Sequence, residues 1–76
     1  MNPSLIHLII RIRGELPEVE NTLNRAMEGL LLAKQTNDDL YLDGVALNLH
    51  SFYSGIERIF ELVATHVDGT RPEGKN

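Results

Sequence analysis

Apolar residues recur at helical spacing through the second half of the chain, most regularly between residues 45 and 64. Steps of four and three residues are typical of a helix that packs one face on other helices. The apolar residues in this rhythm are Val45, Leu49, Phe52, Ile56, Ile59 and Val63. A second row repeats every seven residues beside the first and consists of Ala46, Tyr53, Phe60 and Val67. The pattern predicts a core helix over about 40–67 whose apolar face is wide enough for more than one neighbour.

The first half carries a heptad pattern of its own, which continues without a shift from residue 5 to residue 33. Its apolar positions are Leu5, Ile9, Ile12, Leu16, Val19, Leu23, Ala26, Leu30 and Ala33. Asn2 before Pro3 is typical of an N-cap followed by a first-turn proline, so we expect a helix over about 3–35. Gly14 and Pro17 leave two separate helices as an alternative, because an interior proline costs about 3 kcal/mol. The unbroken register favours one continuous, bent helix.

A polar cluster, residues 36–39, separates the two patterns. Asparagine tolerates the left-handed conformation that ends helices, and aspartate accepts hydrogen bonds from the first amides of the next helix. So short a turn requires the second helix to return antiparallel to the first. The expected fold is all-α: an antiparallel αα-hairpin over 1–68 that assembles into a four-helix or larger bundle by oligomerisation. Gly69 is expected as a left-handed C-cap, and residues 69–76 as a disordered tail.

Two glycines lie inside the second helical pattern, Gly44 and Gly55. Each costs about 1 kcal/mol relative to alanine in a helix. We interpret both as positions where a neighbouring backbone approaches closely.

A length of 76 residues without cysteine leaves association between chains as the route to a stable core. Domains of this size usually need disulfides, metals or oligomerisation. We therefore predict a homo-oligomer, most simply a dimer. The residues expected in the core or the interface are Leu49, Phe52, Tyr53, Ile56, Ile59, Phe60 and Val63. A cytoplasmic location is expected, because no apolar run is as long as a membrane span, the N-terminus lacks a signal-peptide pattern, and cysteine is absent.

The formal net charge is -4 and the acidic excess lies entirely after residue 36. Surfaces that bind nucleic acids show clustered lysine and arginine, because neutralising phosphates dominates their affinity. Arg11 and Arg13 come nearest to such a cluster, but two residues apart on a helix they point to different faces. The sequence therefore predicts no nucleic-acid surface.

Few side chains in this sequence suggest chemistry. Glu57 and Glu61 are one helical turn apart, which fits a solvated helix face better than a carboxylate site. The histidines are too scattered to form a ligand pair on one turn: His7, His50 and His66. Only His50 is a candidate polar site, because it neighbours Tyr53 and Ser54 on the helix surface and could hydrogen-bond within a partner interface. No catalytic, cofactor-binding or metal-binding residue is predicted.

The stretch YLDGVALNLHSFYSGIERIFELVATHVDG, from Tyr41 to Gly69, resembles the HepT-like proteins, and RIRGELPEVENTLNRA resembles them more weakly. The resemblance implies an up-and-down helical bundle that dimerises and acts as a ribonuclease toxin. Its antitoxin would be a minimal nucleotidyltransferase that modifies the toxin on tyrosine. The family signature, Arg-x(4–6)-His-x-Tyr, does not follow Arg25 or Arg58, and His50-Ser51-Phe52 lacks its tyrosine. No catalytic residue of the family can therefore be carried over.

Two functions stay open at this stage. The chain resembles only part of the family's length, and in fuller relatives further helices that contain the signature follow a tail like PEGKN. The first function is therefore a HepT-like toxin–antitoxin protein, or a remnant of one, with RNA as a partner only when those helices are present. The second is a purely structural or interaction module that dimerises and binds a partner helix. The missing signature favours the second for this chain, and the resemblance favours the first for its origin. Ribonuclease activity is not expected of these 76 residues.

Overall fold

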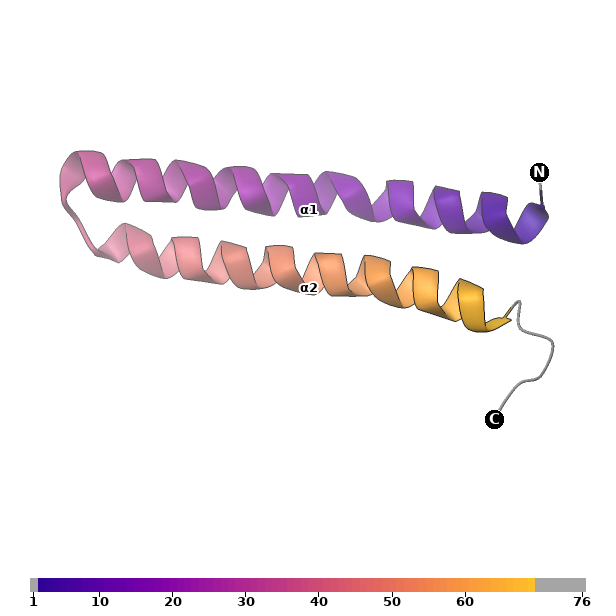
Figure 1. Cartoon of the computed structure of the whole chain (residues 1–76). Helices are drawn as coiled ribbons and strands as arrows, with labels where there is room; N and C mark the ends of the chain where they lie inside the picture. The colour runs from indigo at the N-terminus through magenta and orange to yellow at the C-terminus, as the bar shows by residue number, and fades with distance from the viewer. Residues whose placement is uncertain (1, 70–76) are drawn as a thin grey trace.

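The computed structural model describes residues 2–69, which form two helices and no strand (Figure 1). Helix α1 runs over Pro3–Thr36 and helix α2 over Leu40–Gly69. They lie side by side and antiparallel, so the expected all-α αα-hairpin is confirmed. The Cα atoms extend 56 × 27 × 10 Å, so the molecule is a layer one helix thick. Neither helix, as far as it is described, is long and apolar enough to cross a membrane. The bundle of several hairpins and the cytoplasmic location stay predictions.

Helix α1 begins at the cap that the sequence indicates. The side-chain Oδ1 of Asn2 accepts a hydrogen bond from the N–H of Ser4 at 2.7 Å, and Pro3 occupies the first turn. The helix then continues through Gly14 and Pro17, so one continuous helix is confirmed and the alternative of two helices is wrong. The ribbon runs through this region without a break (Figure 1). A continuous α1 keeps one heptad register along its whole length.

The turn between the helices uses the residue types expected of it. Asn37 is left-handed, with φ 56° and ψ 37°, and ends α1. The side chain of Asp38 accepts a hydrogen bond from the N–H of Leu40 at 3.0 Å, which satisfies a free amide at the start of α2. At the other end, Gly69 is the last residue of α2 and has no positive φ, so the prediction of a left-handed cap there is wrong. The tail predicted over 69–76 lies, beyond Gly69, outside the described residues.

The helices meet along a narrow line of contact, which we call the seam. Its positions recur in steps of three and four and are buried or half-buried: 8, 12, 15, 19, 22, 26 and 29 on α1, and 45, 48, 52, 55, 59, 62 and 66 on α2. A Cβ built on Gly55 would lie 2.6 Å from Cγ2 of Val19, and one on Gly29 would lie 2.9 Å from Cγ2 of Val45. The missing side chains thus let the helices approach closely. The buried hydroxyl of Thr22 is satisfied, because it donates to the carbonyl oxygen of Val19 at 2.8 Å.

The seam does not lie at the centre of the apolar stripes read from the sequence. On α1 it includes Gly29, whereas the predicted Leu30 is 55% exposed. On α2 it includes Gly55, whereas the predicted Leu49 is 46% exposed. Successive residues differ by about 100° around a helix, so the stripes are centred about 50° to one side of the seam. Both helices therefore keep part of their apolar arc outside the hairpin contact.

The predicted close neighbours of the α2 glycines are found at one of the two positions. Gly55 is buried, but against the side chain of Val19 and not against a backbone. A Cβ built on Gly44 would have nothing within 4 Å, so the prediction for Gly44 is wrong within the hairpin. The reason is its place near the exposed start of α2, beside the seam, where α1 does not cover it.

Candidate functional site

One side of the hairpin carries a double row of aliphatic side chains, which we call the apolar face. Its members directly follow every second seam position: 8, 15, 22 and 29 of α1, and 48, 55 and 62 of α2 together with 41, which continues the spacing toward the turn. In two antiparallel helices these flanking positions lie on the same side. The members are Ile9, Leu16, Leu23 and Leu30 of α1, and Leu42, Leu49, Ile56 and Val63 of α2. A groove on this side is lined by Leu16 and Leu23 together with Phe52 of α2, which places the helices' apolar residues beside each other. All eight positions of the double row are aliphatic.

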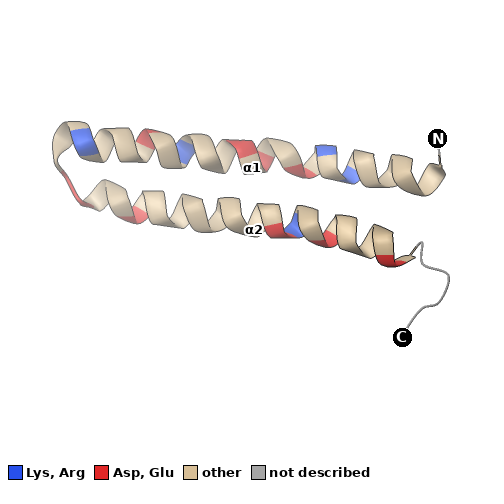
Figure 2. Cartoon of the chain, in the orientation of Figure 1, with Lys and Arg blue, Asp and Glu red and all other residues tan. Residues whose placement is uncertain are grey.

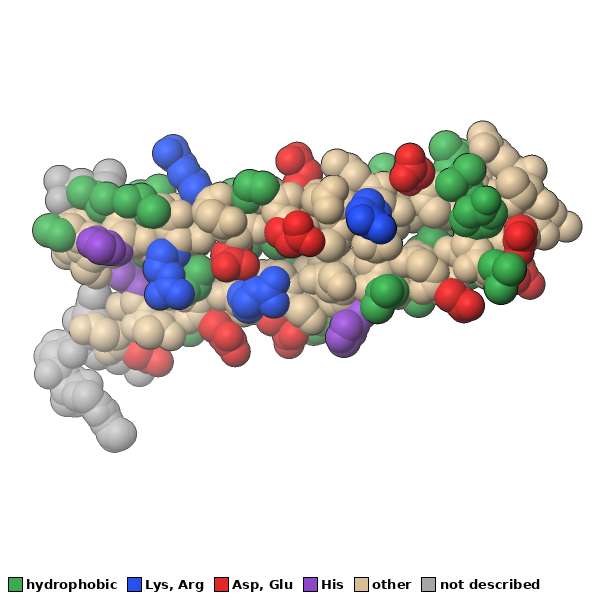
Figure 3. Space-filling model, turned by 180° about the vertical axis from the view of Figure 1, so that it is seen from behind, with side chains coloured by type: hydrophobic (Ala, Val, Ile, Leu, Met, Phe, Trp, Pro, Cys, Tyr) green, Lys and Arg blue, Asp and Glu red, His purple; other side chains and the backbone are tan. Residues whose placement is uncertain are grey.

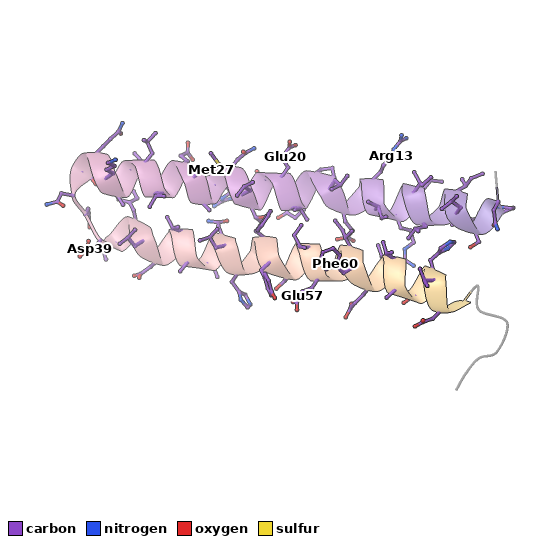
Figure 4. The ribbon with its side chains drawn as sticks, viewed as in Figure 1. Arg13, Glu20, Met27, Asp39, Glu57 and Phe60 are labelled. Atoms are coloured by element: carbon purple, nitrogen blue, oxygen red, sulfur yellow. The ribbon has the colours of Figure 1, made fainter. Side chains whose placement is uncertain are left out.

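A further apolar row widens this face on α2 alone. It contains Tyr53 and Phe60, whose exposed fractions of 63% and 67% are high for aromatic residues. The corresponding positions of α1 are mostly charged and include Arg13 and Glu20, with Met27 next in the row (Figure 4). The part of α2 nearest the turn carries a single charged residue up to position 56 (Figure 2). The exposed apolar surface is therefore broader over α2 than over α1.

The residues that the sequence assigns to core or interface divide over three places. Phe52 and Ile59 lie half-buried in the seam, Leu49, Ile56 and Val63 lie on the apolar face, and Tyr53 and Phe60 lie in the further row of α2. None of the seven is fully buried inside the hairpin. Their burial thus depends on what covers the apolar face.

The opposite side of the hairpin is mostly polar. The positions that flank the seam there directly precede every second seam position, or the continuation of that spacing, and are Arg11, Glu18, Arg25 and Leu32 on α1, and Gly44, Ser51, Arg58 and Thr65 on α2. Leu32 is the one large apolar residue among these eight positions. Charged side chains gather along the middle of this face, over both helices, and hydrophobic side chains lie toward its two ends (Figure 3). The hairpin is therefore amphipathic as a whole, with its seam as the boundary.

A groove of about 440 Å³ lies on the polar face near the open end of the hairpin. Its polar lining comes from both helices: Ser4, His7, Arg11, Glu15, Arg58, Glu61, Thr65 and His66. The Nε of Arg58 donates to Oε1 of Glu15 at 3.2 Å, and Oγ of Ser4 is hydrogen-bonded to Nδ1 of His66 at 3.1 Å. The side chains of the ion pair are 53% and 35% exposed, so the pair contributes at most about 1 kcal/mol. These two contacts join the side chains of α1 and α2 at this end of the hairpin.

His50, the candidate polar site, lines a smaller hollow of about 240 Å³ on the same face. Thr22, Ser54 and Arg58 line it as well. The ring of His50 is exposed and makes no hydrogen bond with any residue of the described range. Tyr53 is one step away on the surface of α2 but does not line this hollow, so His50 shares the hollow with hydroxyl and guanidinium groups and not with a tyrosine.

The polar face offers hydrogen-bonding groups without a recognisable catalytic arrangement. His7 and His66 line the same groove, although 59 positions separate them in the sequence. Acid/base catalysis on a phosphate would need such a histidine beside a cation. The groove also carries Glu15 and Glu61, whose charges offset those of its two arginines. Among residues 2–69, no group of three or more histidine or carboxylate side chains is arranged to hold a metal ion.

The sequence did not indicate the groove residues because they become neighbours only when the helices pair. Ser4 and His66 are 62 positions apart, and no motif joins them. The signal that could have found them is the heptad register itself, once α1 and α2 are aligned through Gly55 and Val19.

Comparisons with protein-family models, with curated proteins and with solved structures give no match to this chain. The resemblance of Tyr41–Gly69 to the HepT-like proteins therefore stays a prediction from the sequence.

Proposed function

We propose that this chain is an interaction module that binds helices through its apolar face and so becomes part of a larger helical bundle. The observation that carries the proposal is the contrast between the two sides of the seam. All eight positions of the double row that flanks the seam on the apolar face are aliphatic, whereas seven of the eight flanking positions on the opposite side are not. A helix pair that stays single in water needs apolar residues in its seam but gains nothing from an apolar face beside the seam, because that face makes no contact between the two helices.

The energetics support a covered face. Burying one large apolar side chain stabilises a protein by roughly 1.5 to 3 kcal/mol, and Tyr53 and Phe60 are among the many that the hairpin leaves exposed. The radius of gyration is 17.4 Å, against about 11 Å expected for a compact domain of this length. The hairpin alone thus buries little for its size, and binding another helical element would supply the missing core.

The second candidate is a HepT-like toxin–antitoxin protein whose nuclease residues are absent from these 76 residues. It is favoured by the quoted residues from Tyr41 to Gly69 and by the agreement between the hairpin and the up-and-down bundle that the resemblance implies. In that case the apolar face would receive the further helices of the family, a minimal nucleotidyltransferase would be the protein partner, and RNA would be bound only with those helices present.

Two variants on opposite sides of α2 test the proposed function. Phe60→Glu changes the apolar side and Ser51→Glu, the matched control, changes the polar side; both positions are exposed in the hairpin. We measure binding of the dye 8-anilinonaphthalene-1-sulfonate, sedimentation equilibrium at micromolar concentration, and thermal melting. Wild type and Ser51→Glu should associate or bind the dye, and Phe60→Glu should lose most of that behaviour.

One outcome of these measurements would refute the proposed function. A wild-type monomer that melts cooperatively and binds no dye would show that the apolar face needs no occupant, and the proposed function would be wrong. If the wild type is a monomer that does bind the dye, its apolar face is accessible and the proposed function stands. The occupant of the face would then be a different protein.

A further inference from the structure

We infer that the occupant of the apolar face is a second copy of this chain, related by a two-fold axis perpendicular to the helices, with α2 antiparallel to α2 and α1 antiparallel to α1. The inference rests on the proposed function and names its partner. It follows from three observations: the level at which α1 and α2 face each other, the order of charges along α1, and the order of apolar residues along α2.

The seam determines which residue of α1 and which residue of α2 lie at the same height along the hairpin, which we call the same level. Val19 faces Gly55, and Gly29 faces Val45. In both pairs the residue numbers add to 74, so residue 17 of α1 lies level with residue 57 of α2. A two-fold axis perpendicular to the helices must therefore pass α1 and α2 at residues whose numbers add to about 74.

The charges on α1 favour one crossing point among those nearest the middle of the helix. Seven-residue spacing places Ile6, Arg13, Glu20, Met27 and Lys34 in one row beside the apolar face. Antiparallel pairing about a point midway between Arg13 and Glu20 sets each arginine opposite the glutamate of the second copy. The same pairing sets Ile6 opposite Met27. Pairing about Arg13 or Glu20 itself would bring like charges together, and pairing midway between Glu20 and Met27 would set Arg13 opposite Lys34, which is also unfavourable.

The row on α2 selects a matching point. Antiparallel pairing about the midpoint of Tyr53 and Phe60 sets each tyrosine opposite the phenylalanine of the second copy, and Ala46 opposite Val67. Aromatic side chains then face aromatic side chains, the small Ala46 faces the larger Val67, and the row contains no charged residue. The α1 midpoint, between residues 16 and 17, is level with a point between residues 57 and 58 of α2. The two midpoints thus agree within about one residue, or about 1.5 Å along a helix.

The surface available is sufficient for a stable dimer. The accessible surface of the chain is 5978 Å², against about 4650 Å² expected for a monomer of 8.5 kDa. The difference is about 1300 Å² for the chain of 76 residues, against the roughly 800 Å² that each partner buries in a standard interface.

An axis parallel to the helices is the main alternative for two copies. It would place α1 over α2 of the second copy, with Arg13 within one residue of the level of Phe60 and Glu20 within one residue of the level of Tyr53. Arg13 could stack on the ring of Phe60, but neither Arg13 nor Glu20 would have the ion-pair partner that the perpendicular axis gives to both. The perpendicular axis is therefore favoured, and the two arrangements predict different crosslinks.

Thiol crosslinking distinguishes the arrangements, because the chain contains no cysteine of its own. A mixture of Tyr53→Cys and Phe60→Cys chains, treated with a short thiol–thiol crosslinker, should give several-fold more covalent dimer than either variant alone. The matched control is a mixture of Ser51→Cys and Arg58→Cys, which has the same spacing on the polar face and should give only background. More product from Tyr53→Cys mixed with Glu20→Cys would overturn the perpendicular axis. No product above the control, from a chain that still associates or binds the dye, would overturn the second copy as occupant and leave the proposed function standing.

A charge swap gives a second measurement that keeps the aromatic residues intact. Arg13→Glu and Glu20→Arg should each raise the dissociation constant of the dimer several-fold, since each places like charges opposite each other. The double variant should return it close to the wild-type value. The two residues are seven positions apart on one helix and do not touch within a chain, so rescue reports a contact between copies. A double variant as weak as the single ones would contradict the inferred pairing.

Discussion

Replacing Gly55 by alanine tests the seam at its closest point. The new Cβ would lie 2.6 Å from Cγ2 of Val19, a distance that real Cβ atoms essentially never show, and 3.7 Å from Nη2 of Arg58. Val19 is 6% exposed and β-branched, so it holds one strongly preferred rotamer in the helix and has little room to turn. The substitution must therefore strain Val19 or separate the helices.

The size of the effect follows from two opposing contributions. Alanine is favoured over glycine in a helix by about 1 kcal/mol. Overpacking of a contact typically costs about 1 to 3 kcal/mol. The free energy of unfolding should therefore fall by 0 to about 2 kcal/mol for Gly55→Ala. Gly14→Ala and Gly44→Ala meet nothing within 4 Å, so only the first contribution applies and each should gain about 1 kcal/mol.

Urea unfolding followed by circular dichroism measures these differences. All variants are compared at one protein concentration, because association adds to apparent stability. Adding Val19→Ala to Gly55→Ala removes the overlapping methyl group, so the double variant should lose less than the two single losses together. If Gly55→Ala stabilises the chain as much as Gly44→Ala does, the helices do not approach at Gly55 and the seam described above is wrong.

Three further outcomes follow from the arrangement of the faces. Ile56→Asp should lower the free energy of unfolding by several kcal/mol, because it places a charge on the apolar face, while Glu57→Ala should change it by no more than about 0.5 kcal/mol; similar melting curves would refute the assignment of faces. Glu15→Gln, which breaks the exposed ion pair, should cost less than about 1 kcal/mol in low salt, and a loss that persists in 1 M NaCl would contradict a screened surface pair. Labelled RNA should stay intact with the purified chain and with His50→Ala, since the chain carries a net charge of -4 that repels a polyanion; specific cleavage lost only in the variant would make His50 catalytic.

The helices and their turn could be predicted because local chemistry determines them. Asn2 caps α1 with its own side chain, and Asn37 takes the left-handed conformation that ends it. Asp38 supplies the acceptor for the start of α2. None of these contacts depends on the pairing of distant segments, so the residue types alone indicate them. The end of α2 was predicted wrongly because Gly69 permits a left-handed conformation without requiring it.

The position of the seam could not be predicted from one sequence. The usual inference takes the centre of an apolar stripe as the line of contact, which is sound for a helix covered from one direction. Here Leu30 and Leu49 remain exposed, while Gly55 is buried and Gly29 is half-buried. The stripe reflects all the surfaces that a helix prefers to bury, and the hairpin contact uses one edge of it. The groove that joins Ser4 to His66 was hidden for the same reason, since its members depend on the pairing.

The small residues of the seam also determine the shape of the apolar face. With glycine at 29 and 55, the helices approach closely enough for the aliphatic rows on either side of the seam to form one surface. Larger seam residues would move the rows apart and leave a furrow between them, which a second layer of helices would have to fill. The close seam therefore buries few large apolar side chains within the hairpin and leaves most of the others together on one flat side. That arrangement suits the proposed binding of another helical layer, which would leave the polar groove on the outer surface.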